Sequence, residues 1–147
     1  MGKLIIMVFS IVLAIFMSSC ESFKEHQRFA YAVIENPDKY DSLWRNSIFY
    51  DTIYPAVTMV TDAPWNAGES ALPYYLDKIK DIFTNNQYNL DYCKDFYNER
   101  KKIRSYSIYF NSPNHNHFLS FHFNYVNNKW VLEGFSVGQG TWYKLEF

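Results

Sequence analysis

His122 and Glu133 are the two residues of this sequence whose types and spacing best suit acid–base chemistry. They lie in two segments of alternating apolar and polar residues, and between the segments Asn127 and Asn128 form a two-residue hairpin turn, because Asn tolerates the positive φ that such turns require. In a hairpin without a bulge, His122 directly faces Glu133, and opposed side chains lie close enough to interact. The pair is therefore a candidate general acid and base beside a pocket, and the alternative is an ion pair at the surface.

His115 and His117 are candidate metal ligands, because histidines two positions apart can share one face of a strand. The sequence offers no acidic or thiol third ligand at a suitable spacing, and the alternative is a polar tip between two strands. Cys93 has no histidine near it in the sequence, so we expect a buried or partly buried thiol rather than a nucleophile. No cofactor is expected.

Aromatic residues supply the candidates for a binding surface. They make up 20% of the chain, and several occur in loops or at the edges of elements as well as in the expected core. Exposed Tyr and Trp are favoured at recognition surfaces, whereas packing in the core is the alternative for each of them. The binding candidates are Trp65, Tyr74 and Trp142.

Length and charge limit the class of protein. The 147 residues allow one domain, and the aromatic content is too high for a disordered chain. With 14 Lys+Arg against 15 Asp+Glu, the chain has no strongly basic face, which argues against a nucleic-acid partner. The densest basic stretch, over residues 94–104, also contains Asp95 and Glu99, so we expect a solvated loop or strand entrance that could also touch anionic headgroups.

Hydrophobic periodicity predicts the elements that hold these residues. Helical spacing covers residues 21–35 and about 70–84, and Asn36-Pro37-Asp38 is expected to end the first helix and begin a second. One short strand is expected near Ala56 to Thr61. An antiparallel meander of strands is expected from Ile103 onward, and it closes with Trp142 to Phe147. This order predicts an α+β fold, with N-terminal helices packed on a curved C-terminal antiparallel sheet of about four to five strands.

The N-terminal segment is typical of a secretion signal. Lys3 precedes an apolar run over residues 4–16, which is too short for a transmembrane helix of about 20 residues. The run ends in Met17-Ser18-Ser19-Cys20.

This ending resembles the lipobox of bacterial lipoproteins, in which small residues precede a cysteine that is acylated and becomes the mature N-terminus. The resemblance implies a signal peptide over residues 1–19 and a membrane anchor through lipid on Cys20, which leaves residues 20–147 for the single α+β domain. Stable anchoring takes two or more acyl chains. Glu21 rather than Asp follows Cys20, so the resemblance implies the outer membrane, facing the periplasm. An ordinary cleavage site with an incidental cysteine is the alternative.

The predicted element order is also similar to the nuclear-transport-factor-two-like and cystatin-like folds, which share a hairpin like Val126-Asn127-Asn128-Lys129-Trp130-Val131-Leu132. That resemblance implies a cone-shaped pocket, and members of the superfamily include dehydratases and isomerases as well as non-enzymatic binding domains, so the fold alone cannot choose between them.

The sequence favours an envelope lipoprotein of non-enzymatic binding type that recognises a protein or another envelope component. A small pocket enzyme using His122 and Glu133 is the first alternative, and an immunity or inhibitor lipoprotein is the second.

Overall fold

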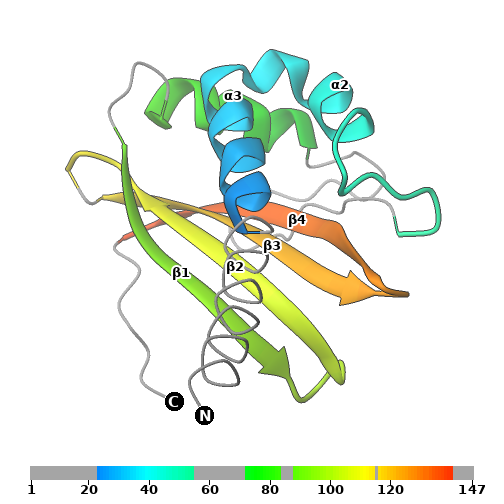
Figure 1. Ribbon diagram of the computed structural model, residues 1–147. Helices are drawn as coiled ribbons and strands as arrows, with labels where there is room; N and C mark the ends of the chain where they lie inside the picture. The colour runs from blue at the N-terminus through cyan, green and yellow to red at the C-terminus, as the bar shows by residue number, and fades with distance from the viewer. Residues whose placement is uncertain (1–22, 55–71, 84–87, 115, 141–147) are drawn as a thin grey trace, which may run out of the picture.

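The computed structural model describes residues 23–54, 72–83, 88–114 and 116–140. Within these ranges three helices in the N-terminal part of the chain lie on one face of an open four-stranded antiparallel sheet (Figure 1). The predicted α+β class, with helices packed on a C-terminal antiparallel sheet, is therefore confirmed. The strands expected near residues 56–61 and 142–147 lie outside the described residues.

The N-terminal helix is described over residues 23–35. One side of it is fully buried, because its apolar residues recur every three or four positions and so line one face of the helix. The buried apolar residues are Phe29, Ala30, Val33 and Ile34. The ring of Phe29 packs edge-on against Phe121 and Phe123 of the sheet, with centroids 6.3 and 6.2 Å away.

A short 3-10 turn, η1 (Pro37–Lys39), leads directly into α2 (Tyr40–Arg45), as the Asn-Pro-Asp signal predicted. Pro37 occupies the first position of the turn, where its missing N–H is not needed, although the Asn36 side chain makes no capping hydrogen bond. Buried Tyr40 contacts Phe135 of the sheet at 5.3 Å between ring centroids.

Helix α3 (Leu72–Phe83) is the third helix that covers the sheet. Tyr75, Ile79 and Phe83 are buried at a spacing of four residues, which confirms the predicted apolar face. None of the helices in the described ranges combines the length and the apolar character needed to cross a bilayer.

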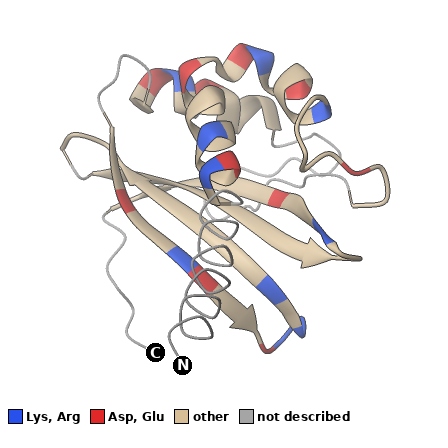
Figure 2. Cartoon of the chain, in the orientation of Figure 1, with Lys and Arg blue, Asp and Glu red and all other residues tan. Residues whose placement is uncertain are grey.

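The four strands follow one another along the chain as a meander, and each pairs antiparallel with the next. They are β1 (Asn89–Asn98), β2 (Ile103–Asn111), β3 (His117–Val126) and β4 (Lys129–Gln139). Charged side chains occur on the helices, on β1 and near the hairpin turns, whereas β3 carries no Lys, Arg, Asp or Glu (Figure 2). The predicted meander is confirmed for the last three of these strands.

Strand β1 was not predicted from the sequence, which placed a loop or strand entrance in this region. β1 is an edge strand whose residues are all exposed or half-buried, and its register with β2 shifts between Leu90 and Tyr92. An irregular edge strand shows no clean alternation of apolar and polar residues, so the period-two signal is lost there.

The core lies between the helices and the face of the sheet that carries alternating aromatic and aliphatic residues. Phe121, at its centre, is fully buried and contacts Phe135 of β4 at 5.6 Å and Phe110 of β2 at 6.2 Å between centroids. Aromatic pairs in edge-to-face geometry add to the stabilisation from buried area alone.

We expect Phe121→Ala to lower the free energy of unfolding by about 3–5 kcal/mol, because the substitution removes a fully buried ring and leaves a cavity. Tyr97→Ala is the matched control, since Tyr97 is 55% exposed and its loss should cost less than about 1 kcal/mol. Urea denaturation followed by circular dichroism measures both, and equal costs would contradict the placement of Phe121 in the core.

Candidate functional site

The structure does not place His122 opposite Glu133, so the predicted strand register at this pair is wrong. The turn itself is as predicted, with Asn127 and Asn128 at φ values of 49° and 63°, and Asn124 pairs with Val131. A bulge then shifts the register between Phe123 and His122, so that His122 pairs with Gly134.

Glu133 is the extra residue of this bulge, and its carboxylate forms an ion pair with Lys101 from the turn between β1 and β2. A single inserted residue redirects a side chain, which is why the opposed-pair argument fails here.

The imidazole of His122 instead lies in a row of serine hydroxyls on the face of the sheet away from the helices. Its Nδ1 is 2.9 Å from Ser107 Oγ and its Nε2 is 2.9 Å from Ser120 Oγ. Ser120 Oγ is also 2.9 Å from Ser136 Oγ, so three strands contribute to one hydrogen-bonded row. Both ring nitrogens of His122 therefore have partners.

The hydrogen bonds of this row are compatible with a neutral imidazole. One ring nitrogen of a neutral histidine donates and the other accepts, so one of Ser107 and Ser120 accepts from the ring and the other donates to it, as the tautomer decides. The hydroxyls of Ser120 and Ser136 bond each other, and either can be the donor. Each group in the row has a compatible role when His122 is neutral.

This arrangement does not favour His122 as a general base. Burial, together with the charge of Lys101, lowers the pKa of His122 to about 4, so the ring is neutral and a weak base near pH 7. A general base works best when its pKa lies near the working pH. The serine row is better explained as the means by which three strands satisfy buried polar groups.

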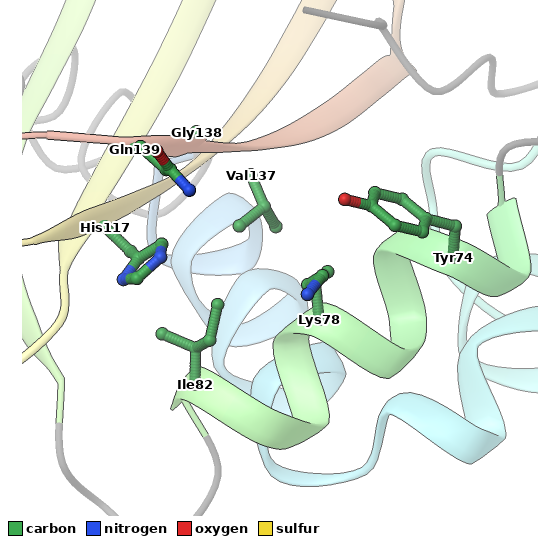
Figure 3. Close-up of a pocket in the computed structure, with 7 residues that line it drawn as sticks. All are labelled: Tyr74, Lys78, Ile82, His117, Val137, Gly138 and Gln139. Atoms are coloured by element: carbon green, nitrogen blue, oxygen red, sulfur yellow. The ribbon is translucent and has the colours of Figure 1, made fainter. Parts of the chain in front are cut away.

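A pocket of about 100 Å³ at one end of the sheet is the stronger candidate site. It lies between α3 and the adjoining ends of β3 and β4, and Figure 3 shows side chains from both sides directed toward it. Its lining residues are Tyr74, Lys78 and Ile82 from α3, and His117, Val137, Gly138 and Gln139 from the sheet.

The backbone holds the strand side of this pocket firmly. His117 N–H donates to Ser112 Oγ at 3.1 Å, and His117 C=O accepts from Ser112 N–H at 2.9 Å. Gly140 N–H donates to Asn116 C=O at 2.7 Å, which ties the end of β4 to the start of β3. Gly138 leaves room for the Phe118 ring, because a Cβ at position 138 would lie 2.4 Å from that ring.

The pocket combines a cation and hydrogen-bond donors with an apolar floor. Lys78 Nζ lies 5.6 Å from the centroid of the Tyr74 ring, a cation–π contact, and among the described residues its ammonium pairs with no carboxylate. Ile82 and Val137 supply apolar surface, and the described residues that line the pocket include no Asp or Glu. The chemistry suits a ligand with an anionic group on a small apolar body.

Two residues that the sequence singled out meet in this pocket, namely the binding candidate Tyr74 and the metal candidate His117. No group of three or more metal-ligating side chains gathers anywhere in the described ranges, and His115 lies outside them. The other binding candidates, Trp65 and Trp142, and the lipidation candidate Cys20 also lie outside the described residues.

Sequence reasoning missed Lys78 and Gln139. Tyr74, Lys78 and Ile82 recur every fourth residue and so share one side of α3, which is a signal that the sequence did contain. Gln139 gave no signal, because only the pairing of His117 with Gln139 at the strand ends brings it to the pocket.

The thiol of Cys93 and the imidazole of His26 also lie against the core. Cys93 is half-buried, as expected, and its Sγ accepts a weak hydrogen bond from Gln27 Nε2 at 3.8 Å. His26 is fully buried among aromatic rings, with centroids 4.6 Å from both Phe49 and Phe123. The sequence pattern did not predict this second buried imidazole.

Comparison with protein-family models, with curated proteins and with solved structures found no match to this chain.

The free energy of unfolding should depend on pH through His122. An exposed histidine has a pKa near 6.5, and burial lowers that of His122 to about 4, so between these values only the unfolded chain binds the proton. The contribution of His122 to the free energy of unfolding is then fully present above about pH 6.5. It decreases by roughly 3 kcal/mol as the pH falls toward 4.

Urea denaturation of the wild type and of His122→Gln across this pH range measures the difference, since carboxylates common to both proteins cancel. Because the variant could fold poorly, an NMR titration of the His122 ring in the wild type provides an independent measurement. A midpoint near 6.5 in that titration would show that the ring is not held neutral.

Proposed function

We propose that the protein is a lipid-anchored lipoprotein of a bacterial envelope, of non-enzymatic binding type, which recognises an anionic group on a protein or another envelope component. The pocket between α3 and the ends of β3 and β4 is the recognition site. The observation that carries the binding part of the proposal is the ammonium of Lys78 beside Tyr74, His117 and Gln139, because the part of the chain that the structure describes offers it no carboxylate there.

The anchoring part of the proposal is supported by the N-terminal sequence. The apolar run over residues 4–16 and the small residues before Cys20 resemble a lipoprotein signal, and acylation would leave the α+β domain held at a membrane surface. We place the protein on the outer membrane, facing the periplasm.

A binding role accounts for the geometry better than the pocket-enzyme alternative does. The enzyme hypothesis needed His122 and Glu133 as partners, whereas His122 hydrogen-bonds serines and Glu133 pairs with Lys101. The pocket itself lies at the end of the sheet where β3 begins, at His117. Its polar side chains suit recognition of a charged group rather than proton transfer.

Cys20 should be the acylated residue. Metabolic labelling of cells with an alkyne analogue of palmitate, followed by fluorescent detection, should label the wild type and lose the signal in Cys20→Ala. Cys93→Ala is the matched control, because Cys93 is the other cysteine of the sequence and is half-buried in the domain. Label that persists without Cys20, or that depends on Cys93, would contradict the anchor.

Lys78 should be required for capture of the partner. A photo-crosslinking amino acid at position 74 should give one dominant adduct in cells, and Lys78→Glu should reduce its yield several-fold, since a charge-assisted hydrogen bond contributes about 1.5–3 kcal/mol. Lys80→Glu is the control on the same helix, because Lys80 pairs with exposed Asp38 outside the pocket and such a pair adds little stability. Equal yields in the two variants, or no adduct, would contradict the assigned site.

A further inference from the structure

A row of aromatic and cationic side chains crosses the sheet next to its hairpin turns. Tyr97 of β1 pairs with Arg104 of β2, and Tyr125 of β3 pairs with Trp130 of β4. Between β2 and β3, Ser105 pairs with Asn124, so the next residue toward the turns on each strand places Arg104 beside Tyr125. The two tyrosines, Arg104 and Trp130 therefore lie on one line across all four strands. This line is called the turn-end row below.

The turn-end row lies on the helix-covered face, just beyond the described start of the N-terminal helix. Phe23 stacks on Tyr106 at 4.3 Å between ring centroids, and the Arg104 guanidinium lies 5.8 Å from the Phe23 ring and 5.5 Å from the Trp130 ring. Asp95 holds Arg104 with two hydrogen bonds of 3.0 and 2.7 Å. The first turn of this helix is therefore fixed against the row.

The side chains of the row remain accessible to an external partner. Tyr97 is 55% exposed and Tyr125 is 38% exposed, although Tyr125 packs on Trp130 at 5.3 Å. Tyr and Trp with one apolar and one polar end are favoured at the headgroup level of a bilayer, and Arg can reach phosphate there.

Unpaired cations border the same row. Lys24 follows Phe23, while Arg100 and Lys102 lie in the turn between β1 and β2, and none of the three forms an ion pair within the described ranges. Glu99, in the same turn, also forms no ion pair within the described ranges. Among the described residues, the charges without an ion pair at this end are therefore net positive, which complements anionic lipid headgroups.

The sequence places the expected lipid close to this surface. Phe23 is the third residue after Cys20, and three residues of extended chain span at most about 10 Å. β3 has 10 residues and hence a length of about 30 Å, so the pocket at His117 lies far from the turn-end row.

We propose that the turn-end row, with Arg100 and Lys102, rests on the headgroup layer of the membrane that holds the lipid anchor, and that the pocket thereby faces away from the bilayer. This inference rests on the proposed lipid anchor. It adds a fixed orientation, in which one end of the sheet contacts phospholipid and the other end is presented to the partner.

Site-directed spin labelling of the full-length lipidated protein tests this orientation. In a Cys93→Ala background, a nitroxide is attached at Tyr125→Cys or, as the control, at Tyr74→Cys in the pocket, and the two native tyrosines are equally exposed at 38%. The protein is reconstituted in vesicles of phosphatidylethanolamine and phosphatidylglycerol. Collision rates with oxygen, which concentrates in the bilayer, and with a water-soluble nickel chelate are then measured.

The label at position 125 should show a several-fold higher ratio of oxygen to nickel accessibility than the label at position 74. Tyr97→Cys, on the more exposed of the two tyrosines of the row, should behave like Tyr125→Cys and protects the test against a local packing defect. Equal ratios in protein that floats with the vesicles would overturn the orientation and leave the anchor intact. Protein that neither floats nor carries acyl label would overturn both proposals.

Discussion

The sheet depends on keeping one aromatic face out of water. Phe110, Phe121 and Phe135 from three neighbouring strands meet in the centre of that face, and none has significant exposed surface. Burial of such rings is the main favourable term available to the core, because Cys93 is free and the described residues contain no disulfide. The helices are held where they are because their apolar sides complete this core.

The same constraint determines which parts of the sheet remain open. Helix α3 lies beside the ends of β3 and β4 at His117 and Gln139, and the N-terminal helix begins against Tyr106 near the hairpin turns. At the first end this packing leaves the pocket beside α3, and at the other it leaves Tyr97 and Tyr125 on the surface. Two chemically different surfaces thus follow from one packing arrangement: a pocket that contains Lys78, and an aromatic row bordered by Arg100 and Lys102.

The bulge at Glu133 shows how strongly one residue can change a site. Without it, Glu133 would face His122, and the two would resemble an acid–base pair. With it, Glu133 meets Lys101 and His122 joins a row of serine hydroxyls. Burial, together with the charge of Lys101, lowers the pKa of His122, so the chemistry of this imidazole is set by the strand register rather than by its sequence neighbours.

The sequence by itself determined the helices, the three strands of the meander and the turn at Asn127 and Asn128, because periodicity and turn chemistry are local properties. It also singled out Tyr74 and His117, although in separate roles. Only the tertiary structure brought those two residues together with Lys78 and Gln139, placed the irregular edge strand β1, and moved Glu133 out of register. These features depend on pairing between distant segments, and a single-residue shift in such pairing leaves the apolar pattern of the sequence almost unchanged.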